Sequence, residues 1–200
     1  MITLTDDIYS QNDGRFYDMG MLPDVKTDSN YPFPAITYDT TKEPKFDHKL
    51  HLALEDPENV AIMANGEYKT VPQYTCKTNQ NGSEFMYSSP FELFTEEGSR
   101  VARKILTELK RDAKSNGRSC CLRGIWYSSP WFKDMMLSPE YRNHMSQICG
   151  EPVYPHMYLQ NTQLNVGKVG APGPVDQWHF DSVCYVCVSL LSDIDGMIGT

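Results

Sequence analysis

The residues best suited to chemistry in this sequence are His179 and Asp181, which are separated by one residue in the stretch QWHFDS. On an extended chain, residues i and i+2 point to the same side, so the imidazole and the carboxylate converge while Phe180 faces away. Imidazole and carboxylate suit divalent iron, and two histidines with one carboxylate form the ligand set of non-haem iron oxygenases. A surface ion pair and the acid–base pair of a hydrolase are also compatible with the two residues.

Other histidines could supply a further ligand. His48 and His51 converge only on a helix, and solvated surface histidines are the expected interpretation. His144 lies beside the apolar stripe of a predicted helix and is expected to be a core or surface histidine. His156 opens a predicted strand and is interpreted as a structural residue. The sequence therefore predicts two metal ligands, His179 and Asp181, without a third.

The composition narrows the class of protein. The 200 residues include 26 acidic and 18 basic ones, with a formal net charge of -8 and no local Lys/Arg cluster. Nucleic acid and anionic membrane surfaces are therefore not expected partners. The N-terminal residues carry early acids and no apolar block, so we expect no secretory signal and a cytoplasmic location with reduced cysteines. Cys184 and Cys187 are three apart in a predicted strand and face opposite sides, so no zinc or redox site is expected there.

The sequence pattern changes near residue 90. Residues 1–89 contain many turn-forming residues and predict an irregular N-terminal extension, in which Pro72 restricts residues 68–74 to an edge strand. Residues 90–200 predict an organised domain. Its first helix covers residues 95–116, with Thr95 as the cap and an apolar stripe of Val101, Ile105 and Leu109.

A second helix is predicted at residues 138–149, where Ser138, Pro139 and Glu140 occupy favoured N-terminal positions and Gly150 ends the helix. Residues 119–127 predict a strand, and core strands are expected from residue 155. A Gly/Pro loop follows at residues 170–174, and residues 182–193 form an apolar run typical of a strand covered on both faces. The predicted fold class is α+β, with helices packed on a β-sandwich or jelly roll.

These motifs resemble a known superfamily. The stretches FELFTEEG, ICGEPVYPH, QLNVGKVGAPGPVDQWHFDS and SLLSDIDGMIG make residues 90–199 similar to the first half of a double-stranded β-helix dioxygenase that uses Fe(II) and 2-oxoglutarate, of the phytanoyl-CoA dioxygenase-like type. The resemblance implies that His179 and Asp181 are the first two iron ligands. Tyr158 and Asn165 could bind the co-substrate, as residues of that strand sometimes do in the superfamily, or they could be ordinary sheet residues. Arg123 could contribute to substrate recognition or form a structural salt bridge.

The reaction implied by the resemblance is the oxidation of an unactivated C–H bond by O₂, coupled to the decarboxylation of 2-oxoglutarate to succinate and CO₂. A carboxylate at Asp181 implies hydroxylation, because related halogenases have a small residue there that leaves room for chloride. The resemblance also implies a small-molecule substrate, but neither the identity of that substrate nor the oligomeric state is specified by the sequence.

The sequence also departs from the family pattern. The family's third ligand, a histidine, and the Arg or Lys that binds 2-oxoglutarate follow several strands later, but no His, Arg or Lys comes after Asp181. We therefore expect a truncated or partial chain whose jelly roll is incomplete at the C-terminus. Two other interpretations stay open: an inactive β-fold binding protein derived from the family, and a cupin-like metal-binding protein that uses His179 without 2-oxoglutarate.

Overall fold

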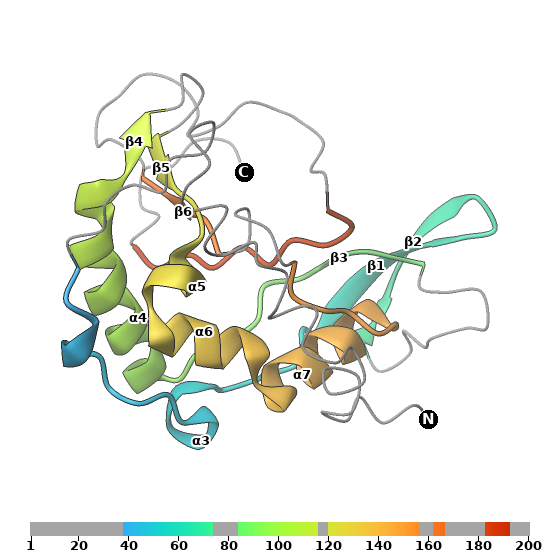
Figure 1. Cartoon of the computed structure of the whole chain (residues 1–200). Helices are drawn as coiled ribbons and strands as arrows, with labels where there is room; N and C mark the ends of the chain where they lie inside the picture. The colour runs from blue at the N-terminus through green and yellow to red at the C-terminus, as the bar shows by residue number, and fades with distance from the viewer. Residues whose placement is uncertain (1–37, 74–83, 116–119, 157–161, 167–182, 193–200) are drawn as a thin grey trace, which may run out of the picture. The chain divides into compact units, whose positions relative to one another are not determined.

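A computed structural model describes residues 38–73, 84–115, 120–156, 162–166 and 183–192. The chain divides into two compact units. Unit 1 contains the described residues among 46–98 and 134–155, and unit 2 contains those among 38–45, 99–133 and 156–192. Helices and small antiparallel sheets are mixed, which confirms the α+β class (Figure 1). Each unit contains described residues from before and after residue 90.

Unit 1 contains a three-stranded antiparallel sheet in the order β2-β1-β3. Its strands are β1 (Asn59–Ala64), β2 (Glu67–Pro72) and β3 (Phe85–Ser88). Asn65 and Gly66 join β1 to β2 with φ values of 55° and 78°, the conformation of a tight hairpin turn whose twist matches the strands. The expected irregular extension is therefore wrong for these residues, because Asn65 and Gly66 favour a hairpin turn that pairs β1 with β2. The prediction that Pro72 lies on an edge strand is confirmed.

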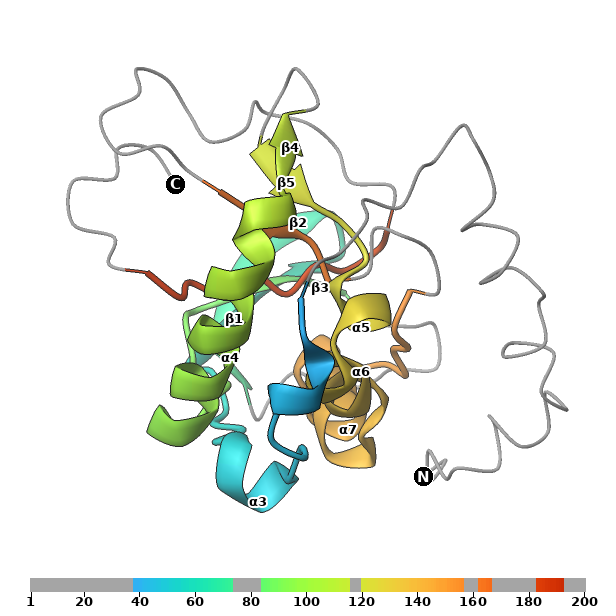
Figure 2. The ribbon, with the colours of Figure 1, turned by 60° about the vertical axis from the view of Figure 1, so that its left-hand side comes forward.

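Unit 2 contains a second three-stranded antiparallel sheet, with the order β4-β5-β6. Its strands are β4 (Lys114–Ser115), β5 (Cys120–Leu122) and β6 (Leu164–Asn165), and Figure 2 shows β4 and β5 side by side. The strand predicted at residues 119–127 is shorter than expected, because Gly124 adopts a left-handed conformation with φ 71° and α5 (Ile125–Ser128) begins there.

The first predicted helix corresponds to α4 (Glu96–Leu109). Thr95 caps it as predicted, with its Oγ1 accepting a hydrogen bond from the Gly98 N–H at 3.0 Å. The apolar stripe is buried as predicted. The helix ends at Leu109 rather than at residue 116, and a 3-10 turn, η3 (Lys110–Asp112), leads into β4. The reason is that the apolar stripe stops at Leu109, so packing no longer favours further helical turns.

Before the first sheet lie a 3-10 turn, η1 (Thr40–Lys42), and the short helix α3 (His48–His51). Thr95 joins α3 to α4, because its hydroxyl donates to the Leu50 carbonyl at 2.6 Å and its N–H donates to the His51 carbonyl at 3.1 Å. Gly98 lies so close to the His51 carbonyl that a Cβ there would overlap it. Glycine is therefore needed at this junction for space and not for its backbone angles.

Two further helices follow α5. Helix α6 (Pro130–Leu137) was not predicted, whereas α7 (Pro139–Cys149) confirms the prediction at residues 138–149. The Ser138 hydroxyl accepts a hydrogen bond from the Tyr141 N–H at 3.2 Å, and Gly150 ends α7 in a left-handed conformation with φ 71°. Both ends of α7 are thus closed by the residues that the sequence indicated.

The apolar run at residues 183–192 is not a strand in the described part of the chain. Val186, Val188 and Leu190 are 55%, 76% and 58% exposed, so the predicted burial on both faces is wrong. The prediction relied on residue type alone, whereas a strand also requires hydrogen-bonding neighbours. No helix among the described residues is long and apolar enough to cross a membrane.

Candidate functional site

Three of the four predicted site residues lie outside the described residues: His179, Asp181 and Tyr158. The fourth, Asn165, lies on β6 with an exposed side chain. The relation of Asn165 to the predicted iron ligands therefore stays a prediction. Within the described residues, Asn165 belongs to a group of polar side chains that the second sheet brings together.

The strands β5 and β6 bring Asn165 close to Arg123, which follows β5 directly. Asn165 pairs with Cys121, and Leu164 pairs with Leu122. The same register places Arg123 opposite Gln163. The side chains confirm this placement, because the Arg123 Nε donates a hydrogen bond to the Gln163 Oε1 at 3.0 Å. Arg123 was proposed from the sequence for substrate recognition and lies half-buried on the same sheet as Asn165.

Gln163 connects the two residues, since its Nε2 donates to the Asn165 Oδ1 at 2.7 Å. On the other side of β5, Lys114 pairs with Cys121. Antiparallel partners and residues two apart along a strand point to the same side of a sheet. We call this side the polar face, and its residues are Lys114, Cys121, Arg123, Gln163 and Asn165.

Sequence reasoning missed Gln163, although it lies two residues before Asn165 and so shares its side of an extended strand. Lys114 was missed because residues 110–116 were assigned to a helix. A helix would turn Lys114 away from Cys121, whereas the short strand β4 brings the two residues opposite each other. The spacing of Gln163 and Asn165 in the sequence was thus enough to identify Gln163. Lys114 could be identified only by predicting that α4 ends before residue 114.

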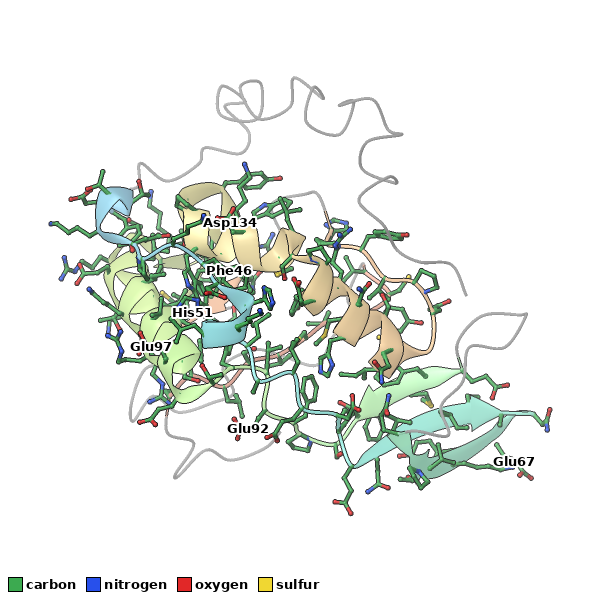
Figure 3. All side chains as sticks on the ribbon, turned by 90° about the horizontal axis from the view of Figure 1, so that it is seen from below. Phe46, His51, Glu67, Glu92, Glu97 and Asp134 are labelled. Atoms are coloured by element: carbon green, nitrogen blue, oxygen red, sulfur yellow. The ribbon has the colours of Figure 1, made fainter. Side chains whose placement is uncertain are left out.

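The two histidines of α3 do not converge on a common site. His51 is 1% exposed, its Nδ1 accepts a hydrogen bond from the Asp47 N–H at 3.0 Å, and its ring lies beside Phe46 (Figure 3). The expectation of a solvated His51 is therefore wrong, because α3 packs against the start of α4. The His48 side chain is instead partly exposed, and its Nδ1 lies 3.6 Å from the Glu140 Oε1.

His144 is a core histidine, one of the two locations expected for it. It lies on α7, is 7% exposed, and has Phe91 edge-on to its ring at a centroid distance of 5.7 Å. Its Nδ1 is 3.8 Å from the Asp56 Oδ1. Burial lowers the pKa of His144 below its ordinary value, and the nearby Asp56 carboxylate opposes that shift only in part. The neutral imidazole is therefore the form that the fold favours.

A half-buried carboxylate, that of Glu43, organises the start of α6. The Glu43 Oε2 accepts hydrogen bonds from the Ser129 Oγ at 3.0 Å and from the Trp131 N–H at 2.8 Å. The Ser129 Oγ in turn accepts from the Phe132 N–H at 3.2 Å. Pro130 has no N–H, so these bonds satisfy the free donors of the first turn. Burial, and then the Glu43 charge, raise the pKa of the Tyr38 hydroxyl.

No group of three or more His, Cys, Asp or Glu residues among those described is arranged to hold a metal ion. Cys184 and Cys187 are both exposed. A metal site at His179 and Asp181 stays a prediction, because both residues lie outside the described residues. Their imidazole and carboxylate are ligand types that suit divalent iron. No family model, curated protein or solved structure matches the chain.

Proposed function

We propose that the chain belongs to a non-haem Fe(II)- and 2-oxoglutarate-dependent oxygenase of the hydroxylase type, with a double-stranded β-helix fold and a small organic substrate. One observation carries the proposal: the H-x-D pair, His179 and Asp181, stands between the Gly/Pro loop at residues 170–174 and an apolar run. That order of features is the one in which the superfamily presents its first two ligands.

The proposal assigns a separate task to each residue. The neutral imidazole of His179 and the carboxylate of Asp181 would hold iron from one side of an extended segment. The bound metal would supply the activation of O₂ that couples 2-oxoglutarate decarboxylation to substrate oxidation. The Asp181 carboxylate would also fill the position that a halide needs, which favours hydroxylation over halogenation.

The described part of unit 2 supports the proposal through its polar donors. The strand β6 is the described strand that precedes the Gly/Pro loop in the sequence, and it carries Asn165, whose Oδ1 accepts a bond from Gln163. Arg123 donates to the same Gln163. Such donors suit an anionic co-substrate or substrate.

The proposal is tested by anaerobic titration of the 200-residue chain with Fe(II) and 2-oxoglutarate, observed by visible absorption. The expected result is a metal-to-ligand charge-transfer band that needs both additions and is lost in His179→Ala and in Asp181→Ala. The titration is repeated with free imidazole, because the sequence has no histidine after Asp181 to act as a third ligand. Imidazole is expected to strengthen the band by occupying that position.

Matched controls are available in the described residues. His48→Ala removes a partly exposed histidine, and Asp134→Ala removes an exposed carboxylate on α6. Both variants are expected to keep the band. If the band is missing with imidazole present, or if Asp181→Ala keeps it at full intensity, the proposed function is wrong.

A further inference from the structure

We propose that the polar face of the β4-β5-β6 sheet binds the carboxylate group of a small organic acid, with Arg123 and Asn165 as its main donors. The inference needs no metal. It can therefore be tested separately from the proposed oxygenase function. It rests on the direction of the hydrogen bonds, on the charges around Arg123 and on the shape of the donor set.

The direction of the hydrogen bonds is fixed by Arg123. A guanidinium only donates, so the Gln163 Oε1 must be the acceptor of the 3.0 Å bond. The Gln163 amide then presents its Nε2 to Asn165, whose Oδ1 accepts at 2.7 Å. Each amide oxygen therefore already accepts one hydrogen bond. The donors that remain are the Nη1 and Nη2 groups of Arg123, the second N–H of the Gln163 amide and the Nδ2 of Asn165.

The charge of Arg123 is not neutralised within the described part of the chain. No ion pair there involves Arg123, although the chain carries a net charge of -8 and several exposed lysines and arginines do pair with carboxylates. Asp112 precedes β4 and is the acid closest to this sheet in the sequence. It forms no ion pair with Arg123 among the described residues. An arginine that is half-buried and has no counterion among the described residues can bind an anion from outside the chain through charge-assisted hydrogen bonds.

The sheet also sets the shape of the donor group. Cys121 is 9% exposed and lies between Lys114 and Asn165, so a small, covered side chain separates the two outer strands. Asn165 and Lys114 are exposed, whereas Arg123 is half-buried. The donors thus lie around a small residue, and a ligand can approach them from the solvent side.

The donor set suits a carboxylate better than a phosphate. A guanidinium and an amide are planar donors, and a planar carboxylate matches the parallel N–H groups of arginine in pairs. Arg123 supplies one full charge in this arrangement. Lys114 lies on the opposite strand of the sheet, so its flexible ammonium assists only at longer range. One near cation balances one carboxylate, whereas a phosphate dianion requires more.

The test uses the metal-free 200-residue chain, labelled with ¹⁵N and kept in a chelator. Succinate, butyrate, 2-oxoglutarate, inorganic phosphate and neutral butyramide are titrated in turn. The observed signals are the Arg123 Nε–H and the Asn165 side-chain amide, assigned with the variants described below. Saturable shifts of both signals are expected with the carboxylates, and butyramide is expected to cause none.

Three variants separate charge from geometry. Arg123→Gln removes the charge and is expected to weaken carboxylate binding at least tenfold, because a charge-assisted bidentate pair is lost. Arg123→Lys keeps the charge without the planar fork and is expected to give an intermediate loss. Asn165→Asp adds an opposing charge and is expected to abolish binding. Arg103→Gln is the matched control on the exposed side of α4, and it is expected to leave binding unchanged.

The series of probes also distinguishes two sources of the carboxylate. Tighter binding of 2-oxoglutarate than of succinate and butyrate, by tenfold or more, assigns the polar face to the co-substrate of the proposed reaction. Equal binding of butyrate and 2-oxoglutarate assigns it to an acidic primary substrate. The inference is overturned if no carboxylate gives saturable shifts, if phosphate binds more tightly than all of them, or if Arg103→Gln weakens binding as much as Arg123→Gln.

Discussion

Polar side chains at the ends of the helices and on the second sheet are used in different ways. At the start of α6, the Glu43 carboxylate accepts two hydrogen bonds from groups of the same chain, and Thr95 makes three in joining α3 to α4. On the polar face, the bonds of Arg123, Gln163 and Asn165 form a chain that ends, within the described residues, in donors without acceptors.

This difference separates stability from binding. Groups that form their hydrogen bonds within the fold add to the free energy of unfolding, and their removal leaves buried partners unsatisfied. Groups that keep donors for an outside anion add little to stability, because solvent already satisfies them in the free protein. Substitutions at the helix ends are therefore expected to lower stability without changing carboxylate binding, and substitutions on the polar face to do the reverse.

The largest effect is expected from Gly98→Ala. In an exposed helix interior this substitution stabilises by about 1 kcal/mol, because alanine is the better helix former. Here the new Cβ would overlap the His51 carbonyl, so α3 or α4 must move. A loss of about 3 kcal/mol in the free energy of unfolding is expected, measured by urea denaturation with tryptophan fluorescence. The exposed control Arg103→Ala should stay near wild type. A stabilised Gly98→Ala variant would show that the helices do not meet there.

A smaller loss is expected from Glu43→Gln, about 1–2 kcal/mol. The amide keeps one acceptor for the Ser129 hydroxyl and the Trp131 N–H, but the charge that favours the start of α6 is lost. The glutamine amide also places N–H donors at the buried position that the Oε1 of Glu43 occupies. Urea denaturation measures the loss, with the exposed Glu67→Gln as the control. Carboxylate binding should not change. Equal free energies of unfolding for Glu43→Gln and Glu67→Gln would show that Glu43 does not stabilise the start of α6.

The sequence predicted the parts of the fold that depend on local patterns. The cap at Ser138, the end at Gly150 and the stripe from Val101 to Leu109 each follow from residues within a few turns of one another, and all are present. The role of Glu43 was not predicted, because its partners Ser129 and Trp131 lie 86 and 88 residues further along the chain.

The candidate site was predicted less completely for the same reason. The pairing of β5 with β6 joins segments about 40 residues apart, as the Arg123–Gln163 hydrogen bond shows, and no local signal specifies that register. Asn165 and Arg123 were identified separately, but their connection through Gln163 required the structure. His179 and Asp181 lie outside the described residues, so their convergence stays a prediction.

The pH dependence of stability offers a smaller test within unit 1. Burial lowers the pKa of His144 from its ordinary value of 6.5, so the unfolded chain takes up a proton before the folded chain does. The stabilising contribution is complete above about pH 6.5 and is lost as the pH falls through the folded-state pKa. The free energy of unfolding should therefore decrease between about pH 7.5 and about pH 5.5, with a smaller decrease in His144→Gln. An NMR titration of the ring with a midpoint above 6.5 would contradict the assignment.

The smallest effect on stability is expected from Arg123→Gln, below about 1 kcal/mol. The change matches Glu43→Gln in kind, since a charged side chain becomes a neutral amide, and each residue is partly buried. Glutamine at residue 123 can still approach Gln163, and no buried ion pair among the described residues is broken. The free energy of unfolding should thus stay near wild type while carboxylate binding weakens. If Arg123→Gln lowers the free energy of unfolding as much as Glu43→Gln does, the main role of Arg123 is to stabilise the fold. Its remaining donors would then no longer support the binding of an external carboxylate.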